Sequence, residues 1–452
     1  MECRIDIVSR ELIKPSSPTP LEKKELKLSL LDQLQAPIFV PVLFFYQKQP
    51  PSSNDFHEDQ TKTTLHLKKS FAESLTKFYP LAGKLNPEHH CVDCDDSGAL
   101  FVEAKVDVSL SEAVQSDEML GQYLPFEPFI KDEIEDVRVK PLLAVQITRF
   151  GCGSNAIGVC ISHKVADLMS FMTFMNSWAA LNRGEITRLV VSNFDVGRHV
   201  FPPVDHDVSF PLQPPNKGKG MVYKRFVFDK EKLKELKELA ISSSAAKSPT
   251  RIEVVTAFLW KHFINVARAK IQGPATTMLF RISHLVNVRS KMSSLLASSP
   301  DENVFPFGNL AIGVPASFTF FRGENQEKKD YYGDLVRLTG DAIKRVNEDY
   351  ILNSAIPSFK ATKGTVEVVQ KPAIIEKDWI FTSWCRFPFY EVDFGWGKPV
   401  SVVPGNLNGI LVILTSTRNE EGIEAWIAML EDEFALLPAE FLSLAATHLF
   451  HA

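Results

Sequence analysis

The chain has 452 residues, of which 45% are hydrophobic and 23% are charged. This is the composition of a globular protein, and the length exceeds what one hydrophobic core supports, so we expect about two or three domains. The net charge of -5 at pH 7 provides no basic surface for nucleic acid. Six cysteines in so long a chain do not suggest a disulfide scaffold, and reduced thiols are expected.

The first residues carry charge, at Glu2, Arg4 and Asp6, where a signal peptide would need an apolar run. The most apolar early segment, 36–46, contains two prolines and is too short to span a bilayer. We therefore expect a cytoplasmic monomer with no membrane or nucleic-acid partner.

Apolar periodicity predicts the elements of the first half of the chain. A helix is expected before Pro80, because apolar residues recur at helical spacing from Leu67 to Phe78. Apolar and β-branched runs predict strands at 37–46, 99–106, 142–150 and 156–162.

His163 follows the last of these strands, and a helix is predicted directly after it. From Leu168 to Leu181 the apolar residues lie on one helical face. His163 thus lies where a strand gives way to a helix, and loops at such junctions often carry catalytic groups on rigid supports.

The second half begins with a segment rich in Pro, Gly and Lys, 201–221, which we interpret as a linker between domains. Asp229 is suited to cap a helix, and Thr250 with Glu253 forms a capping-box pattern. Beyond the linker we predict helices at 230–240, 250–270, 334–347 and 438–448, strands at 222–228, 400–403 and 409–415, and a loop at 293–301. Mixed sheets covered by helices, an α/β or α+β class, are implied.

Three patterns resemble known motifs but lack the context that those motifs need. The segment 151–156 fits a loose dinucleotide pattern, yet a strand and not a helix follows it, so a hairpin turn is expected. Cys91 and Cys94 have no second ligand pair for zinc. The kinase-like Asp393-Phe394-Gly395 has no glycine-rich or H-R-D loop before it. No metal site is predicted.

His163 is the candidate catalytic residue. A neutral imidazole can take a proton from a hydroxyl near pH 7, and such a general base typically contributes about 10²–10⁴ in rate. No G-x-S-x-G nucleophile elbow is present, which favours direct attack by an acceptor without an acyl-enzyme. The alternative is that His163 only satisfies a core hydrogen bond.

Asp167 and the late motif leave alternatives open. If Asp167 shares a helix with His163 it can orient the imidazole; if not, it caps the new helix or binds a cation. The run from Asp393 to Gly397 reads as a tight structural corner with an aromatic anchor. The Thr382 hydroxyl could donate to an oxyanion, although a plain strand with Trp384 in the core is an equal alternative.

Two motifs together suggest a family. His163-Lys164-Val165-Ala166-Asp167 is short and weak alone, whereas Asp393-Phe394-Gly395-Trp396-Gly397 specifies five residues. In this order they resemble the plant BAHD acyltransferases, which move an acyl group from coenzyme A to an alcohol or amine. The runs 15–20, 28–32 and 78–84 match further landmarks, and 383–386 with 394–399 looks most like the branch that includes vinorine synthase.

The resemblance implies two chloramphenicol-acetyltransferase-like domains with mixed sheets and a long crossover loop. The expected limits are 1–200, the linker 201–221, and 222–452, with about 373–393 crossing back into the first domain's sheet.

The resemblance also implies roles for single residues. His163 would be the general base, and Asp167 would pair with Arg289. Thr382 and Trp384 would lie near the acyl carbonyl. Asp393 is a catalytic candidate by its motif, but with Gly395, Trp396 and Gly397 it is expected to be structural.

The implied activity is acetyl transfer from acetyl-CoA, a co-substrate and not a bound cofactor, to an alkaloid or triterpenoid/limonoid alcohol. Two positions depart from the family pattern: Leu168 replaces a common Gly, and 306–310 reads Pro-Phe-Gly-Asn-Leu where malonyl-transferring members carry Tyr-Phe-Gly-Asn-Cys. The second departure favours acetyl over malonyl. N-acyl transfer, malonyl transfer and a non-catalytic binding partner remain alternatives.

Overall fold

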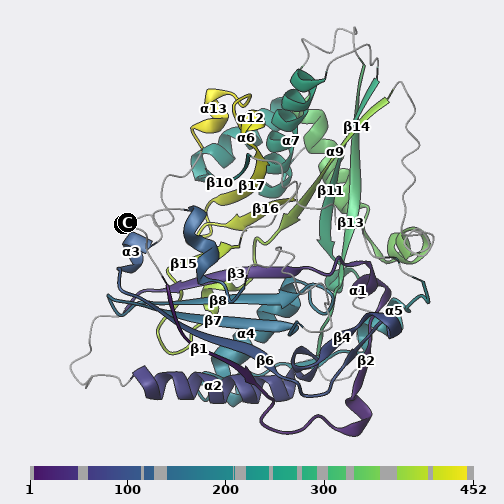
Figure 1. The fold of residues 1–452 in the computed structure, drawn as a ribbon. Coiled ribbons are helices and arrows are strands. Elements are labelled where there is room, and N and C mark those ends of the chain that lie inside the picture. The colour runs from purple at the N-terminus through teal and green to yellow at the C-terminus, as the bar shows by residue number, and fades with distance from the viewer. Residues whose placement is uncertain are drawn as a thin grey trace.

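Two six-stranded sheets dominate the protein, one in the lower and one in the upper half of Figure 1. The computed structural model describes residues 5–48, 60–113, 117–126, 140–206, 208, 220–243, 248–271, 277–292, 304–321, 330–356, 374–405 and 411–444. The predicted loop 293–301 and residues 207 and 209–219 of the predicted linker lie outside these ranges.

The first sheet has the strand order β1-β6-β7-β8-β3-β15. Its strands are β1 (Asp6–Ile13), β3 (Phe39–Tyr46), β6 (Ala99–Val106), β7 (Leu143–Phe150), β8 (Asn155–Ser162) and β15 (Ser401–Pro404). Helices α2 (Gln60–Lys77) and α4 (Leu168–Asn182) pack on it, with the rings of Phe71 and Trp178 4.9 Å apart between them. The strands and helix predicted here are confirmed, and 151–154 is the turn between the antiparallel strands β7 and β8.

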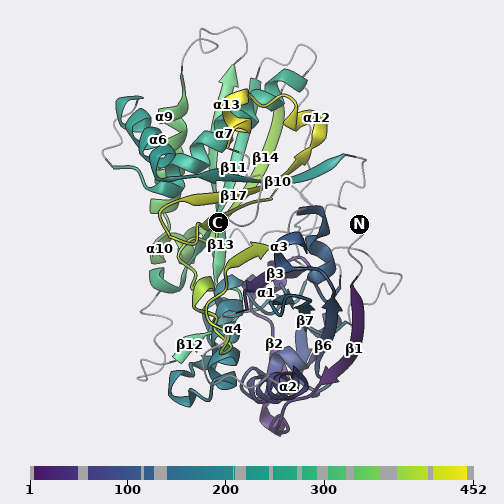
Figure 2. The same cartoon turned by 90° about the vertical axis from the view of Figure 1, so that its left-hand side faces the viewer.

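The second sheet has the strand order β10-β17-β16-β14-β11-β13. Its strands are β10 (Met221–Phe228), β11 (Thr277–Asn287), β13 (Ala311–Phe321), β14 (Ile374–Ser383), β16 (Leu411–Ser416) and β17 (Ile423–Leu430). Helices α6 (Lys230–Ser243), α7 (Arg251–Lys270) and α9 (Tyr332–Lys344) enclose a second core with one face of this sheet (Figure 2). The predicted caps are present: Asp229 accepts from the backbone N–H of Lys232 at 2.7 Å, and Thr250 forms the capping box with Glu253.

Short elements complete the fold. The short helices are α1 (Leu30–Leu34), α3 (Leu110–Ala113), α5 (Val196–Val200), α10 (Glu348–Tyr350), α12 (Glu431–Phe434) and α13 (Ala439–Leu442). The short strands are β2 (Glu25–Lys27), β4 (Lys84–Asn86), β5 (Cys91–Asp93), β9 (Val191–Asn193) and β12 (Val304–Pro306). Of the predicted terminal helix 438–448, α13 covers Ala439–Leu442, and residues 445–448 lie outside the described ranges.

The late part of the chain joins both sheets, but not where the sequence suggested. Strand β14 was expected to cross into the first sheet, yet it pairs with β11 and β16 in the second. Its Phe381 packs in the second core, and both of its edges are occupied. The chain returns to the first sheet later, where β15 pairs with the edge of β3 that β8 leaves free. The domain limits themselves stay a prediction.

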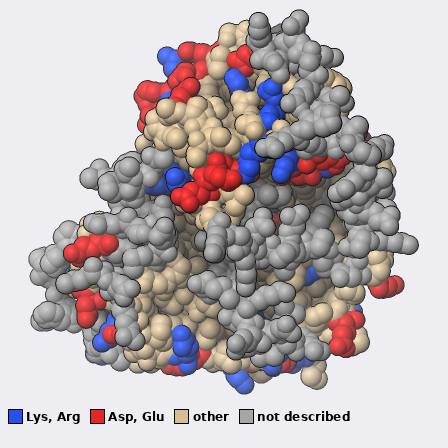
Figure 3. Space-filling view, turned by 45° about the horizontal axis from the view of Figure 1, so that its top comes forward, with Lys and Arg blue, Asp and Glu red and all other residues tan. Residues whose placement is uncertain are grey.

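The two halves also share a core, because Ile413 and Trp426 of the second sheet belong to the first core. None of the described helices combines the length and apolar character that a membrane crossing needs. On the face in Figure 3, Lys and Arg side chains lie among Asp and Glu side chains and do not gather apart from them.

Candidate active site

His163 lies directly after β8 and before α4, at the predicted junction of strand and helix. Its backbone N–H donates to the carbonyl oxygen of Ile38 at 2.8 Å, so the backbone still follows the sheet at this point. The residue is half-buried.

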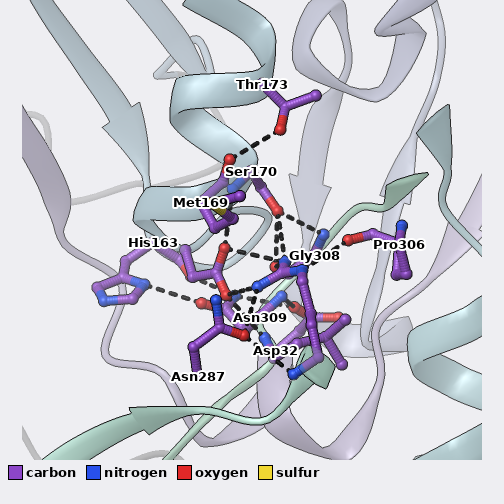
Figure 4. Close-up of polar contacts among 12 residues, drawn as sticks. Asp32, His163, Met169, Ser170, Thr173, Asn287, Pro306, Gly308 and Asn309 are labelled. Atoms are coloured by element: carbon purple, nitrogen blue, oxygen red, sulfur yellow. Dashed lines mark hydrogen bonds and ion pairs between the residues drawn. The ribbon is translucent and has the colours of Figure 1, made fainter. Parts of the chain in front are cut away.

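The imidazole ring is held by one amide (Figure 4). Nδ1 of His163 lies 3.1 Å from Oδ1 of Asn309. The Nδ2 group of Asn309 donates to the backbone carbonyl of His163 at 2.7 Å. Burial lowers the pKa of His163 below its ordinary value of 6.5, because a charged ring is poorly solvated there. The ring is therefore neutral at pH 7 and able to accept a proton.

Asp167 caps α4 and does not touch the imidazole. Its Oδ1 accepts from the backbone N–H of Ser170 at 2.9 Å, and its Oδ2 accepts from that of Leu310 at 3.0 Å. Arg289 contacts both oxygens, at 2.8 Å from Nη1 and 3.1 Å from Nη2. Burial alone would raise the pKa of Asp167, but the charge of Arg289 and the hydrogen bonds hold it below 3.8. The helix-cap alternative thus describes the observed geometry.

Arg289 ties the segment after β12 to the start of α4. Its Nε donates to the carbonyl of Pro306 at 3.0 Å, and its Nη2 donates to that of Gly308 at 3.1 Å. The hydroxyl of Ser170 lies between Nη2 and the backbone of Gly308, 3.0 Å from each nitrogen. The Asp167–Arg289 contact expected from the resemblance is present, and it fixes the segment that carries Asn309.

The motif at Asp393 forms a closed turn. Oδ1 of Asp393 accepts from the backbone N–H of Gly395 at 2.7 Å and of Gly397 at 2.9 Å. Both glycines have positive φ, 97° and 84°, a conformation that costs other residues about 1–2 kcal/mol. The carboxylate therefore acts on its own backbone.

The aromatic residues of this turn anchor it on the first core. Phe394 packs edge-on against Trp178 with ring centroids 4.7 Å apart, and Trp396 packs against Tyr46 at 5.5 Å. Asn182, the last residue of α4, donates to the carbonyl of Phe394 at 2.8 Å. The 15 residues of α4 rise about 1.5 Å each, which puts this contact roughly 20 Å from Asp167. Asp393 is thus remote from His163.

Thr382 and Trp384 are not in contact with His163 by any hydrogen bond or ring contact among the described residues. Thr382 is half-buried and lies opposite Ile413 and Leu285 in the second sheet. Trp384 is buried and packs against Phe389 with ring centroids 5.9 Å apart. Trp384 therefore lies in the core, which was one of its two expected roles. The role of Thr382 stays a prediction.

Two exposed arginines lie near strand ends of the second sheet: Arg386 follows β14, and Arg418 lies between β16 and β17. Burial raises the pKa of the Cys385 thiol, and the charges of Arg251 and Arg386 oppose that rise. Arg251 donates to the carbonyl of Glu420 at 2.6 Å, on the turn that carries Arg418. Within the described ranges Arg386 and Arg418 are exposed and have no carboxylate partner. Guanidinium groups in this state suit phosphate oxygens. In the described part of the chain, no three His, Cys, Asp or Glu side chains are grouped so that they could hold a metal ion.

Asn309 and Asp32 were missed as site residues. Both lie in segments that the sequence had marked as landmarks or departures, 28–32 and 306–310. The spacing of Ser29 and Asp32 is a capping pattern, which α1 confirms. Nothing in the sequence indicates that the carboxylate of Asp32 reaches Asn309, because the two residues are separated by 277 positions.

Comparison with known proteins gives full-length matches. The sequence model of the Transferase family matches residues 3–442. Stemmadenine O-acetyltransferase of Catharanthus roseus is 41% identical, with 99% of each chain covered. Vinorine synthase of Rauvolfia serpentina is 40% identical over 98% of each chain. The limonoid 21-O-acetyltransferase of Melia azedarach is 32% identical, over 98% of this chain and 97% of that one.

The crystal structure of vinorine synthase aligns with a TM-score of 0.81 at 38% identity, over 99% of this chain and 100% of that one. The predicted fold, two domains with mixed α/β sheets, is confirmed by this match.

Replacing Asp167 by Asn should destabilise the fold. The variant leaves Arg289 buried without a carboxylate, and breaking a buried pair typically costs about 3–5 kcal/mol. Because the pKa of Asp167 is lowered in the folded state, this stabilisation exists above about pH 4 and is lost as the pH falls further. Urea unfolding at pH 7 measures the loss. The control is Glu421→Gln, which removes an exposed ion pair with Lys230 whose contribution is small because water screens it. Equal losses in the two variants would contradict this account.

Asp393→Asn should keep both activity and fold, because the amide oxygen can still accept from Gly395 and Gly397. Asp393→Ala loses both bonds, which are worth about 1 kcal/mol each, and should lower the melting temperature while kcat per folded molecule stays within about threefold of the Asn variant. Thermal unfolding and steady-state rates on the same samples test this. A kcat that collapses in Asp393→Asn would establish a catalytic carboxylate instead.

Proposed function

The chain belongs to the BAHD acyltransferase family and is an acyl-CoA-dependent acyltransferase, and we propose that it transfers acetyl from acetyl-CoA to a hydroxyl of a plant specialised metabolite. The proposed mechanism is supported by the half-buried His163 at the strand end, whose imidazole is neutral at pH 7. Relatives named for alkaloid and limonoid acetyl transfer support an alkaloid or limonoid alcohol as the acceptor.

His163 would act through Nε2, since Nδ1 faces Asn309. Nε2 takes the proton of the acceptor hydroxyl as the oxygen attacks the thioester carbonyl. The tetrahedral intermediate then expels the coenzyme A thiolate, and the proton on Nε2 passes to that sulfur. The products are the acetyl ester and free coenzyme A, and the imidazole returns to its neutral state.

Direct transfer between the two bound substrates is favoured over an acyl-enzyme. Among the described residues, the imidazole of His163 has Asn309 as its side-chain hydrogen-bond partner and no serine or cysteine. The nearest cysteine along the strand, Cys160, is buried, and burial raises the pKa of its thiol far above neutral pH. A nucleophile that His163 could activate is therefore missing from this part of the chain.

Acetyl is favoured over malonyl because Arg289, the cation that contacts the segment 306–310, already has partners. Arg289 is occupied by Asp167 and by the carbonyls of Pro306 and Gly308, which leaves it unavailable for a malonyl carboxylate. An amine acceptor would use the same base, and a screen of alcohols and amines distinguishes the two.

His163→Ala should lower kcat by at least about 10², the lower end of the contribution of a general base. The dissociation constant for acetyl-CoA should stay within about threefold, since the imidazole contributes to the chemical step and not to donor binding. Mass spectrometry of products from an alkaloid and limonoid alcohol panel gives the rate, and calorimetry gives donor affinity.

The matched control is His199→Ala, at an exposed histidine. An unchanged kcat in His163→Ala would contradict the proposed mechanism. A wild-type protein that neither binds acetyl-CoA nor acetylates any alcohol would favour the non-catalytic alternative.

A further inference from the structure

Asp32 is a buried carboxylate whose hydrogen bonds all come from neutral donors. Its side chain belongs to α1 and is 8% exposed. Oδ2 accepts from the backbone N–H of Ser29 at 3.0 Å and from its hydroxyl at 2.6 Å. Oδ1 accepts from the backbone N–H and from Nδ2 of Asn309, both at 2.8 Å. Burial raises the pKa of Asp32, and the hydrogen bonds from Ser29 and Asn309 oppose that rise. No ion pair to Asp32 occurs among the described Lys, Arg and His residues.

The orientation of the Asn309 amide follows from these contacts. Both hydrogens of Nδ2 are used, one by Asp32 Oδ1 and one by the backbone carbonyl of His163. A flipped amide would direct its oxygen at a carboxylate and a carbonyl, which are acceptors only. The amide oxygen must therefore face the imidazole, 3.1 Å from Nδ1.

An amide oxygen can only accept, so Nδ1 of the neutral imidazole has to carry the hydrogen. The remaining nitrogen, Nε2, then holds the lone pair. This is the tautomer that a base acting through Nε2 requires, and the other tautomer would present N–H to the acceptor hydroxyl.

We propose that Asp32 is a positioning residue that fixes the tautomer of His163 through the amide of Asn309. The expected effect of Asp32 on the rate rests on the proposed role of His163 as the base. The expected effect of Asp32 on the tautomer does not depend on that role. Asp32, His163 and Asn309 come from three distant segments, after β2, after β8 and after β12 (Figure 4). The small residue Gly308, with φ of 125°, brings the backbone of that last segment close to Asp32.

Asp32→Asn tests the proposal. The new amide can donate to Asn309, which removes one of the two penalties for the flipped amide and leaves the one at the backbone carbonyl of His163. A fraction of the molecules can then turn the NH₂ of Asn309 toward Nδ1. In ¹⁵N spectra of histidine-labelled protein, with His163→Gln for assignment, the wild type should show a protonated Nδ1 and an unprotonated Nε2. Asp32→Asn should populate the Nε2–H form and lower kcat by about tenfold or more, with the KM for acetyl-CoA unchanged.

Asp96→Asn is the matched control. Asp96 also accepts several hydrogen bonds, from Thr19 and Lys24, and lies in the first half of the chain. Its replacement should lower stability while leaving both the tautomer and kcat as in the wild type. An equal fall of kcat in both variants would reduce Asp32 to a structural residue and overturn the proposal.

The double variant Asp32→Asn with Asn309→Asp provides the rescue. A carboxylate at 309 accepts from Nδ1–H in either orientation, and the amide at 32 can donate to it, so the Nδ1–H tautomer should return. Only part of kcat should return, because one carboxylate oxygen then faces the backbone carbonyl of His163. A wild type in the Nε2–H form, or an Asp32→Asn variant that keeps Nδ1–H, would overturn the proposal even if other variants fail to fold. A changed tautomer with full kcat would instead contradict His163 as the base.

Discussion

The ion pair between Asp167 and Arg289 is the interaction on which the site depends. It joins the first turn of α4 to the segment after β11, and through the carbonyls of Pro306 and Gly308 it holds the segment that carries Asn309. Both side chains are about 90% buried, at 9% and 11% exposed. A buried pair does not by itself add much stability, but removing one partner leaves a costly charge. The pair therefore specifies one arrangement of the strand end that presents His163.

This arrangement separates the roles of the two motifs. The imidazole at His163 has a lowered pKa, and within the described ranges no side chain forms a hydrogen bond with its Nε2. The carboxylate oxygens of Asp167 and Oδ1 of Asp393, in contrast, accept hydrogen bonds from backbone or guanidinium donors. Asp393 closes a turn with its own glycines, and its aromatic neighbours pack on Trp178 and Tyr46. A motif with many specified residues identifies the family because structural corners tolerate few replacements. The shorter motif contains the candidate reactive atom.

The sequence predicted the elements whose patterns are strong and local. The strand β3 is buried along its whole length, and α7 opens with a capping box, so both could be read directly. Strands β11 and β13 were not predicted, because apolar residues such as Leu279, Leu285 and Phe321 also occupy their less buried positions and hide the alternation. Strand β13 also contains the exposed Pro315, which an edge strand tolerates. Strand β1 has no buried residue, and its apolar residues come in two adjacent pairs that do not alternate with polar ones.

Only those site residues were predicted that belong to a recognisable motif or to the family resemblance. His163 and Asp167 were found from one short motif, and Arg289 from the resemblance. Asn309 and Asp32 act through contacts across 146 and 277 positions, which no local pattern encodes. The return of the chain to the first sheet was predicted too early for the same reason: the choice between two sheet edges depends on which edge is free in the folded protein.

The most direct test of His163 as a neutral base is the pH dependence of kcat/KM for the wild-type protein. Because burial lowers the pKa of the imidazole below 6.5, the unprotonated form persists into mildly acidic solution. The account predicts that kcat/KM stays level on lowering the pH to 6.5 and falls tenfold per pH unit only below a single ionisation under that value. An ionisation above 6.5, or a rate that does not fall in acid while the protein remains folded, would contradict it.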